Sequence, residues 1–534
     1  MRRVFILISV IVPLGLLLAT AAWPYAGLGF IIVLPIIMLG VYDMLQSKRA
    51  IRRNFPVIGH FRYLFEAIRP EINQYFVESD TDGVPFSRVI RSLVYQRAKQ
   101  VRDTVPFGTK LDVYAPGYRW ANHSLAPTHV DSAELRVSVG GPQCDKPYSA
   151  SIFNISAMSF GALSHSAISA LNGGAKRGHF AHDTGEGGLT PYHLGPGGDI
   201  IWEIGTGYFS CRTKDGHFDP VQFREKATHP HVKMVEIKLS QGAKPGHGGI
   251  LPAAKVTHEI AAIRGVEFGK DVISPPGHSA FSTPLEMMKF VQKIRELSGG
   301  KPAGFKLCLG KRREFIAICK AMQVSKIMPD FIVIDGGEGG TGAAPLEFTN
   351  YIGSPLNDAL VFVHNCLVGF DLRKHIRLIV SGKIVSAFDI VERCALGADM
   401  SNSARGMMMA LGCIQALRCN TNACPTGVAT QDPQLVRGLV VADKATRVFN
   451  YHQQTVASVA EIIGAMGIAH TRELRPWHIM VRQTAHLTQH FGEIFPYLKP
   501  GALLEKTIHP AYARAFAAAQ AGSWGAQEEI EYAA

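Results

Sequence analysis

Residues 378–406 read LIVSGKIVSAFDIVERCALGADMSNSARG, and this stretch decides the fold. Two short apolar runs, Leu378–Val380 and Ala398–Ser401, are each followed by a turn that contains glycine, and a helical pattern over Ala387–Leu396 joins them. A strand, a crossover helix and a second strand in this order form a parallel βαβ unit. The stretch therefore predicts parallel strands whose carboxyl ends meet at one edge.

The same alternation extends back to about Ser149. Eight units over roughly 250 residues have the size of a (β/α)₈ TIM barrel, the α/β fold that we predict. A doubly wound sheet is the alternative, but its Gly-x-Gly-x-x-Gly after the first strand is missing. The expected strands are Ile152–Ser156, His179–His182, Val235–Leu239, Val272–Ser274, Gly304–Leu307, Phe331–Ile334, Leu378–Val380 and Ala398–Ser401. The expected helices include Ser164–Arg177, Ala253–Arg264, Pro284–Leu297, Glu314–Val324 and Ala387–Leu396.

The ends of the last two strands form a candidate phosphate site. One strand ends in Ser381-Gly382-Lys383 and the other in Ser401-Asn402-Ser403-Ala404-Arg405-Gly406, and a helical pattern follows each. Glycine lets the backbone approach a phosphate, while helix amino ends and nearby lysine or arginine favour its charge. Two such loops in register predict a phosphate-bearing cofactor. Two glycine turns without a ligand are the alternative.

Other predicted strands also end in glycine and polar residues. Gly185–Gly188, Gly246–Gly249 and Gly336–Gly342 are rich in glycine, which carries an entropy cost that packing alone rarely explains. Lys238 and Lys306 lie at the ends of strands, where barrel enzymes carry their catalytic groups. A buried lysine beside a flavin stabilises the negative charge of the reduced ring. A core ion pair is the alternative for either lysine.

Three cysteines follow the last predicted strand, as Cys413-x₅-Cys419-x₄-Cys424-Pro425. Crowded thiolates in a reducing compartment usually bind zinc or an iron–sulfur cluster. Zinc prefers four ligands, often in Cys-x₂-Cys pairs, so this spacing fits a three-iron cluster better. The remaining cysteines are expected to be ordinary buried residues rather than a disulfide framework: Cys144, Cys211, Cys308, Cys319, Cys366 and Cys394.

The chain opens with two apolar runs, Val4 to Trp23 and about Leu28 to Leu45. Each is near the ~20 residues that span a bilayer as a helix, and Trp23–Gly27 breaks the helix between them. A cleaved signal peptide ending at Ala19-Thr20-Ala21, or two buried helices, are the alternatives. Basic residues flank both outer ends, so the positive-inside rule predicts a two-helix membrane anchor with the rest of the chain in the cytoplasm: Arg2, Arg3, Lys48, Arg49, Arg52 and Arg53.

The distribution of charge argues against a nucleic-acid partner, and the patterns above divide the chain into four segments. The 534 residues carry a net charge of +12, but no dense basic run with interleaved aromatics, so a nucleic-acid partner is not expected. We predict two transmembrane helices in 1–47, a lead-in segment that packs on the barrel in 48–148, the barrel with its cluster loop in 149–470, and a helical extension in 471–534.

From about Ser151 to Met466 the chain resembles the FMN-binding synthase domain of glutamate synthase. The resemblance rests on long motifs in the same order: Ser156-Ala157-Met158-Ser159-Phe160-Gly161-Ala162-Leu163-Ser164, Thr184-Gly185-Glu186-Gly187-Gly188, Lys238-Leu239-Ser240-Gln241-Gly242-Ala243-Lys244-Pro245-Gly246, Ile273-Ser274-Pro275-Pro276, Gly339-Gly340-Thr341-Gly342-Ala343 and Cys419-x₄-Cys424-Pro425-Thr426-Gly427-Val428-Ala429-Thr430-Gln431.

The resemblance implies FMN at the barrel mouth and a [3Fe–4S] cluster on Cys413, Cys419 and Cys424. In the family, electrons pass through the cluster to FMN, which reduces the imine formed from 2-oxoglutarate and ammonia. The implied cofactor-binding residues are Met158, Ser159, Gly161, Gln241, Lys306, Gly340, Ser381, Gly382, Ala404 and Arg405. The implied catalytic residues are Lys306, Glu186 and Lys238, and the implied substrate-binding residues are Lys244, Gln241 and His278.

The chain also departs from the family pattern. An acidic residue is expected where Leu189 stands, a histidine where Asn420 stands, and His-His-Asp where Gly277-His278-Ser279-Ala280 stands. Position 2 is Arg, so the amino-terminal cysteine of the family's glutaminase domain is absent and we expect ammonia from solution or from a partner.

These observations leave three functional hypotheses. The first is reductive amination of 2-oxoglutarate, with electrons from a ferredoxin-like donor or a membrane redox partner. The second keeps the cofactors and changes the substrate to another amino or imino acid. The third is a membrane-bound electron-transfer flavoprotein. Membrane lipid is an expected partner in all three.

Overall fold

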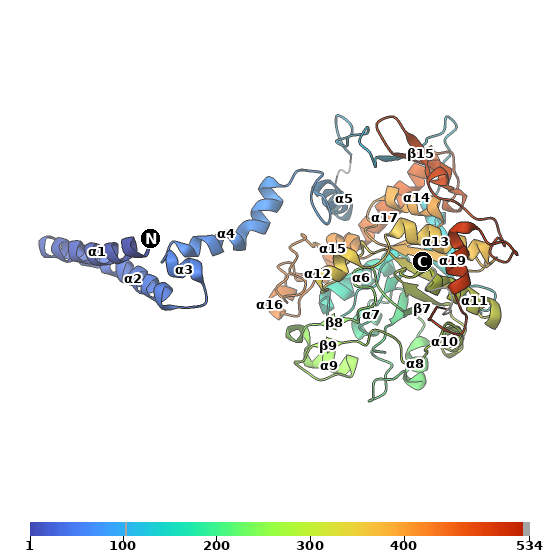
Figure 1. Cartoon of the computed structure of the whole chain (residues 1–534), viewed down its shortest axis with the longest axis horizontal. Coiled ribbons are helices and arrows are strands. Elements are labelled where there is room, and N and C mark those ends of the chain that lie inside the picture. Colours follow the sequence, from blue (N-terminus) through green and yellow to red (C-terminus); the bar gives the residue numbers. More distant parts are fainter. Residues whose placement is uncertain (102–103, 527–534) are drawn as a thin grey trace. The chain divides into compact units, whose positions relative to one another are not determined.

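The computed structural model describes residues 1–101 and 104–526, which form two compact units, Met1–Arg88 and Val89–Ala534 (Figure 1). The first unit contains the apolar helices and the second contains the barrel. Each unit has its own packing and is described by itself.

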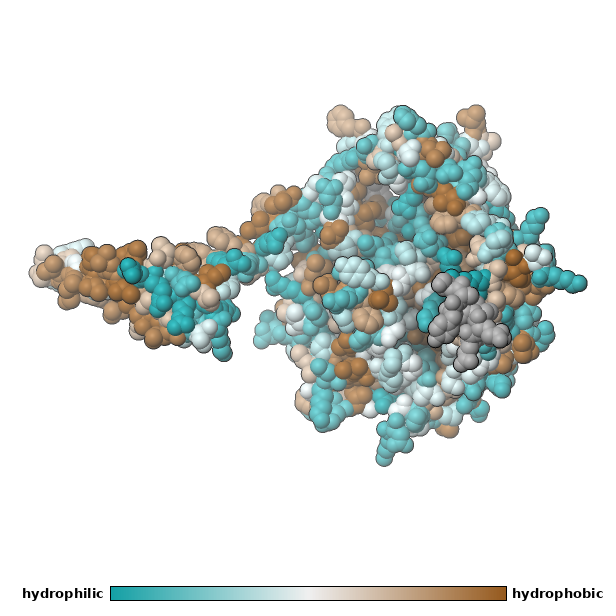
Figure 2. Space-filling view, viewed as in Figure 1, coloured by the Kyte–Doolittle hydropathy of each residue, from teal (hydrophilic) through white to brown (hydrophobic). Residues whose placement is uncertain are grey.

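The first unit begins with two long apolar helices, α1 (Arg2–Ala22) and α2 (Phe30–Leu45), joined by the 3₁₀ turn η1 (Pro24–Gly29). By length and composition, α1 and the continuous segment Pro24–Leu45 are both able to cross a membrane. No residue of α1 is buried, and Figure 2 shows apolar side chains along the helical hairpin. The two predicted helices are therefore present, and their apolar surface is not used as a protein core.

Buried Asp43 connects α2 to the helices that follow it. Its carboxylate accepts hydrogen bonds from the backbone N–H of Val57 at 2.9 Å and from Nε2 of His60 at 2.9 Å. These contacts hold the turn between α3 (Ala50–Asn54) and α4 (Gly59–Ile72) against the end of α2. The first unit is therefore a packed structure and not only a pair of helices.

Eight parallel strands of the second unit close into a barrel in the order β10-β11-β12-β13-β4-β5-β6-β7, which confirms the predicted fold. The apolar runs are buried on both faces, as parallel strands covered by helices require. The strands are β4 (Phe153–Ile155), β5 (His182–Asp183), β6 (Ile200–Ile204), β7 (Val232–Lys238), β10 (Ala303–Leu307), β11 (Phe331–Asp335), β12 (Arg377–Ser381) and β13 (Met400–Ser403).

One predicted barrel strand, Val272–Ser274, is wrong. Val272–Ile273 is β9, which pairs antiparallel with β8 (Ile250–Leu251) outside the barrel. The side chain of Ile273 is exposed, whereas a barrel strand must be buried on both faces. The third barrel strand is instead β6, whose sequence IIWEI is wholly buried.

Helices surround the barrel as crossover connections (Figure 1). The predicted helix Ala253–Arg264 is shorter than expected, because a 3₁₀ turn occupies Ala253–Lys255 and α9 begins at His258. The long helix α17 (Val441–Ala465) packs against α6 at the close approach of Gly174 to Val448. The other principal helices are α6 (His165–Gly178), α8 (Pro220–Ala227), α10 (Pro284–Leu297), α11 (Arg312–Ser325), α13 (Leu356–Gly369) and α14 (Ala387–Leu396).

A hairpin from the lead-in segment closes the amino end of the barrel. Strands β2 (Arg136–Val139) and β3 (Tyr148–Ser151) pair antiparallel, and Val139, Tyr148 and Ala150 join one buried core with residues of six barrel strands or their flanks: Ala181, Ile201, Met234, Phe331, Val333, Ile379 and Met400. The barrel interior therefore opens only toward the carboxyl ends of its strands.

The carboxyl-terminal segment differs from the predicted helical extension. Strands β14 (Ile479–Arg482) and β15 (Thr488–His490) form an antiparallel sheet with β1 (Arg119–Ala121), and the main helix is α19 (Pro510–Ala518). β14 alternates buried and half-buried residues, which is a strand period that the overall apolar content concealed. Residues 527–534 of the predicted extension lie outside the described part of the chain.

We expect Arg295→Met to destabilise the barrel by about 3–5 kcal/mol, because a buried ion pair that loses one partner leaves an uncompensated charge. Arg295 Nε lies 3.0 Å from Asp330 Oδ2, and both side chains are at most 2% exposed. The same aspartate accepts the backbone N–H of Gly141 and of Ala303. Urea unfolding followed by circular dichroism measures the loss. Lys374→Met, which breaks an exposed pair with Asp371, is the control and should cost under about 1 kcal/mol; equal losses would contradict the assignment.

Candidate active site at the carboxyl end of the barrel

Side chains at every second position of a strand share the barrel interior. The apolar floor described above therefore continues upward into a polar layer on the same strands. Each polar residue of this layer lies two positions after an apolar floor residue on the same strand or its flank. The pairs are Ala181 and Asp183, Ile201 and Glu203, Met234 and Glu236, Val333 and Asp335, Ile379 and Ser381, and Met400 and Asn402. This layer lies toward the carboxyl ends of the strands, where barrel enzymes carry their catalytic groups.

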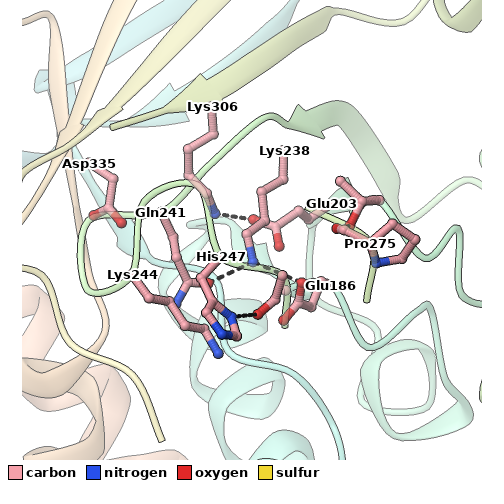
Figure 3. Close-up of polar contacts among 12 residues, drawn as sticks. Glu186, Glu203, Lys238, Gln241, Lys244, His247, Pro275, Lys306 and Asp335 are labelled. Carbon is pink, nitrogen blue, oxygen red and sulfur yellow. Dashed lines mark hydrogen bonds and ion pairs between the residues drawn. The ribbon is translucent and has the colours of Figure 1, made fainter. Parts of the chain in front are cut away.

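Lys238, at the end of β7, is held between two predicted site residues (Figure 3). Its Nζ donates to Glu186 Oε2 at 2.9 Å and to Gln241 Oε1 at 2.6 Å. Burial by itself would raise the pKa of Glu186, but the charge and hydrogen bond of Lys238 outweigh burial and lower that pKa to about 2. Glu186 is thus ionised at neutral pH, and the structure brings these three residues together.

Two further cations lie near Glu186. Burial lowers the pKa of Lys244 to about 8 and that of Arg264 to about 10, while the charge of Glu186 opposes both shifts. Lys244 Nζ donates to the backbone oxygen of Ala343 at 3.0 Å, and Arg264 Nη2 donates to that of Phe160 at 2.9 Å. Arg264 was not among the predicted site residues.

Lys306, at the end of β10, points into the acidic part of the layer. Its Nζ forms a short ion pair with Glu203 and lies 3.2 Å from Glu236 Oε1 (Figure 3). Burial would lower the pKa of Lys306, but the charges of Glu203 and Glu236 outweigh burial and raise it well above its ordinary value. In this structure Lys306 is a core ion-pair residue, the alternative raised by its position in the sequence.

His278, predicted to bind substrate, uses both ring nitrogens within the protein. Nε2 lies 2.8 Å from the backbone oxygen of Lys238, and Nδ1 lies 3.0 Å from the hydroxyl of Tyr208. The carbonyl requires Nε2 to carry the proton, so Nδ1 accepts from Tyr208. Burial lowers the pKa of His278 to about 4, so the ring is neutral and holds the end of β7 in place.

The loop at Met158–Gly161 lies against the glycine-rich loop after β5. A Cβ added to Gly185 would lie 2.7 Å from the backbone nitrogen of Ser159, and one added to Gly187 would lie 2.9 Å from the backbone oxygen of Phe160. These glycines are therefore required for the close approach of two loops from neighbouring strands. The contact positions Met158, Ser159 and Gly161 at the barrel mouth beside Glu186.

The predicted phosphate residues also converge. Ser381 donates to Asp335 at 2.6 Å, and Gly382 has φ +137°, a conformation that favours glycine. A Cβ added to Gly340 would lie 2.7 Å from Arg405 Nε, so the glycine-rich loop after β11 packs directly on Arg405 at the start of α15 (Arg405–Leu411). Ala404 is the residue that precedes this helix.

The side-chain amide of Asn402 bears on whether these residues fit a cofactor. Its side chain is buried on β13, yet neither Oδ1 nor Nδ2 has a hydrogen-bond partner in the described part of the chain. A buried amide without partners costs free energy unless a ligand or water supplies them. The unsatisfied amide, the glycine-lined loops and the arginine are a donor set that suits a planar, phosphate-bearing cofactor, so the residues present fit FMN.

The structure brings the three clustered cysteines into electrostatic contact. The thiols of Cys419 and Cys424 both contribute to raising the pKa of Cys413, after burial, which raises it to about 11. The three thiols therefore lie on one loop within electrostatic reach of one another, a donor set that suits an iron–sulfur cluster.

Buried Lys255 joins the cysteine loop to the barrel mouth. Its Nζ donates to the backbone oxygen of Ala162 at 3.0 Å and to that of Ala429 at 2.9 Å. Ala162 follows the Met158–Gly161 loop, and Ala429 follows Cys424 by five positions. One lysine therefore bridges the segment beside the predicted flavin and the segment of the predicted cluster.

The residues not predicted from the sequence include the acidic residues Asp183, Glu203, Glu236 and Asp335, and also Asn402. The available signal was a charged or amide residue inside an apolar strand, as in IIWEI and VKMVEIK. Each such residue is unusual in a parallel strand that is buried on both faces.

Known proteins resemble this chain over most of its length. The family model described as a conserved region in glutamate synthase matches residues 128–469. The glutamate synthase large subunit-like protein YerD of Bacillus subtilis is 37% identical over 500 residues, which are 85% of this chain and 94% of YerD.

Two relatives named as glutamate synthases match a smaller part. The archaeal glutamate synthase [NADPH] of Methanocaldococcus jannaschii is 36% identical over 323 residues, 60% of each chain. The glutamate synthase [NADPH] large chain of Azospirillum brasilense is 31% identical over 344 residues, which are 63% of this chain and 21% of that one. The resemblance predicted from the motifs is confirmed, and the chain belongs to the glutamate synthase family of oxidoreductases.

Proposed function

We propose that this protein uses FMN and a [3Fe–4S] cluster to aminate a 2-oxo acid reductively, with 2-oxoglutarate as the first candidate. The observation that carries the proposal is the group formed by Lys238, Glu186, Lys244 and Arg264 at the barrel mouth. Three buried cations surround one carboxylate there, so the group has excess positive charge. A dicarboxylate substrate supplies the missing negative charge, because buried charges require partners.

The chain's residues have separable roles in this proposal. Lys244 and Arg264 bind the carboxylates of the substrate. Lys238 with Glu186 orients the carbon that would receive the hydride and moves a proton to the nitrogen bound to that carbon. Ser381, Gly382, Gly340 and Arg405 hold the cofactor phosphate, while Met158, Ser159, Gly161 and Gln241 lie against its ring. FMN, when bound, supplies the hydride.

The cluster belongs to Cys413, Cys419 and Cys424 in this proposal. Lys255 connects their loop to the segment that follows Met158–Gly161, which places a short protein link between the two redox groups. A ferredoxin-like protein or a membrane redox partner supplies the electrons, and ammonia comes from solution or from a partner protein.

We further propose that residues 1–47 anchor the protein in a membrane, with the barrel in the cytoplasm. The apolar side chains of both long helices are exposed, and arginine and lysine residues flank the outer ends of the pair. An exposed apolar surface of this extent requires lipid or another apolar partner.

One observation favours a second candidate, the reduction or oxidation of a different amino or imino acid. Leu189 is buried in the loop after Glu186, where the resemblance leads one to expect an acidic residue. Its backbone N–H donates to Ser210 Oγ at 2.9 Å, so the loop is ordered with an apolar side chain inside it. An apolar wall at this point favours a less polar substrate.

The first test is an anaerobic titration of the detergent-purified full chain. After reduction, 2-oxoglutarate and ammonium together should reoxidise the flavin, because the imine forms only when both are present. Visible absorbance at the flavin band follows the reaction. Lys238→Met should slow it by at least about 100-fold, since a proton donor is lost, whereas exposed Lys270→Met should not change it. A flavin that stays reduced with both reagents rejects 2-oxoglutarate as the substrate.

Serine substitution of Cys413, Cys419 or Cys424 should abolish the cluster but leave the flavin bound, because the thiolates are its ligands. Electron paramagnetic resonance of the oxidised protein and an iron assay report the cluster, and the flavin released on denaturation reports FMN. Half-buried Cys144→Ser is the control and should keep full iron content. Retention of the signal in all three variants would exclude the cysteines as ligands.

The membrane anchor predicts how the protein fractionates. Alkaline carbonate washing of membranes should leave the full chain in the pellet, because two apolar helices are held by lipid rather than by surface charge. Amino-terminal sequencing of the extracted protein should begin at or just after Met1. A mature sequence that begins near Ala22 would instead establish a cleaved signal peptide.

A further inference from the structure

We propose that Asp183, Glu203 and Glu236 together store a proton inside the barrel, and that Asp183 passes it toward Lys238 when the substrate is reduced. The transfer of the proton during turnover rests on the proposed function, whereas the presence of the proton in the barrel does not. It assigns a role to a buried charged cluster that neither FMN, the iron–sulfur ligands nor the substrate group requires.

The geometry of the cluster carries the argument. One carboxylate oxygen from each of Asp183, Glu203 and Glu236 lies within 4.8 Å of the other two, and all three residues are buried. They come from the adjacent strands β5, β6 and β7, and Glu203 is paired in register with Glu236. Three buried carboxylates are thus held within 4.8 Å of one another.

Charge balance requires a bound proton. Lys306 from β10 is the cation that touches the cluster, at Glu203 and Glu236. Lys238 also faces Asp183 but is already paired with Glu186, and Asp335 from β11 adds a further negative charge near Lys306. On β4, β12 and β13 the interior positions hold the uncharged residues Asn154, Ser381 and Asn402, and Arg377 at the start of β12 donates instead to the backbone oxygen of Ser138. Like charges this close cannot all remain ionised in a buried site.

Hydrogen bonding indicates where the proton lies. Glu236 Oε2 has no hydrogen-bond partner among the described residues, and Oε1 has Lys306 Nζ at 3.2 Å. Burial raises the pKa of Glu236 well above its ordinary value, and burial with the charge of Glu203 raises that of Asp183 to about 7. Burial therefore favours the protonated form of both Glu236 and Asp183.

A metal ion is the other occupant that three carboxylates suggest. Lys306 argues against it, because its ammonium group contacts two of the three residues and occupies the position of a cation. A hard divalent ion usually needs six or more oxygen ligands or waters, and this buried group offers three side chains.

Asp183 is the carboxylate of the three that lies nearest in the chain to Glu186, the partner of Lys238. Its Oδ1 accepts the backbone N–H of Gly185 at 3.0 Å, next to Glu186, and both Lys306 and Lys238 act on its charge. Conversion of 2-oxoglutarate and ammonium to glutamate and water takes up two electrons and two protons. The electrons come from the reduced donor. The three carboxylates of Asp183, Glu203 and Glu236 provide one of the protons and regain it from solvent through the open end of the barrel.

Infrared spectroscopy of the purified full chain without substrate tests for the stored proton. We expect a C=O band of a protonated carboxyl group at pH 7 that shifts in D₂O, weakens between pH 6 and pH 8 as Asp183 ionises, and is reduced in Glu236→Gln and in Asp183→Asn. Both variants match the protonated side chains in shape. Exposed Glu225→Gln is the matched control and should leave the band unchanged.

Two results would overturn the proposal. One is a wild-type spectrum without such a band, which needs no variant to fold. The other is one equivalent of a divalent metal bound by the wild-type protein and lost in Glu236→Gln.

The rate of flavin reoxidation tests whether Asp183 transfers the proton during turnover. Asp183→Asn should slow flavin reoxidation by 2-oxoglutarate and ammonium by about 100-fold, in the range of a lost proton donor, with an unchanged Kd for 2-oxoglutarate. An unchanged rate would reject the proton transfer. If wild-type protein is not reoxidised at all, the proposed substrate fails while the infrared band still decides the stored proton.

Discussion

The alternation of side chains along eight parallel strands is the constraint on which the rest of this structure depends. Every second residue faces the barrel interior, so the apolar floor and the polar layer above it are inseparable parts of the same strands. Floor residues such as Met234 require the next interior positions, Glu236 and Lys238, to lie closer to the open end. The fold therefore concentrates its interior charges at one end.

Closure of the amino end of the barrel strengthens the interactions among these interior charges. The β2–β3 hairpin fills the amino end with Tyr148 and its neighbours, so the interior is closed at that end. Charges in the polar layer then interact across a low-dielectric interior, where they are stronger than in water. The same hairpin is tied to the strands by Asp330, which binds Arg295 and the backbone of Gly141.

Residues that depart from the family pattern are integrated in the packing. His278 supports the carbonyl of Lys238 and leaves its ring nitrogens no capacity for a substrate. Leu189 is buried, and its backbone N–H donates to Ser210 Oγ. The scaffold thus keeps the core group of Lys238, Glu186 and Gln241 while its surroundings have changed, which is where a difference in substrate would arise.

The sequence by itself determined the barrel, the pair of apolar helices, the family and most of the residues at the mouth, because strand periods, glycine turns and long motifs are local features. It did not identify β6, whose continuous apolar run shows no alternation, and it placed Val272–Ser274 in the barrel because a short apolar run does not reveal what it pairs with. Only the tertiary structure brought Asp183, Glu203 and Glu236 to one point, because proximity between strands depends on register, which no single strand encodes.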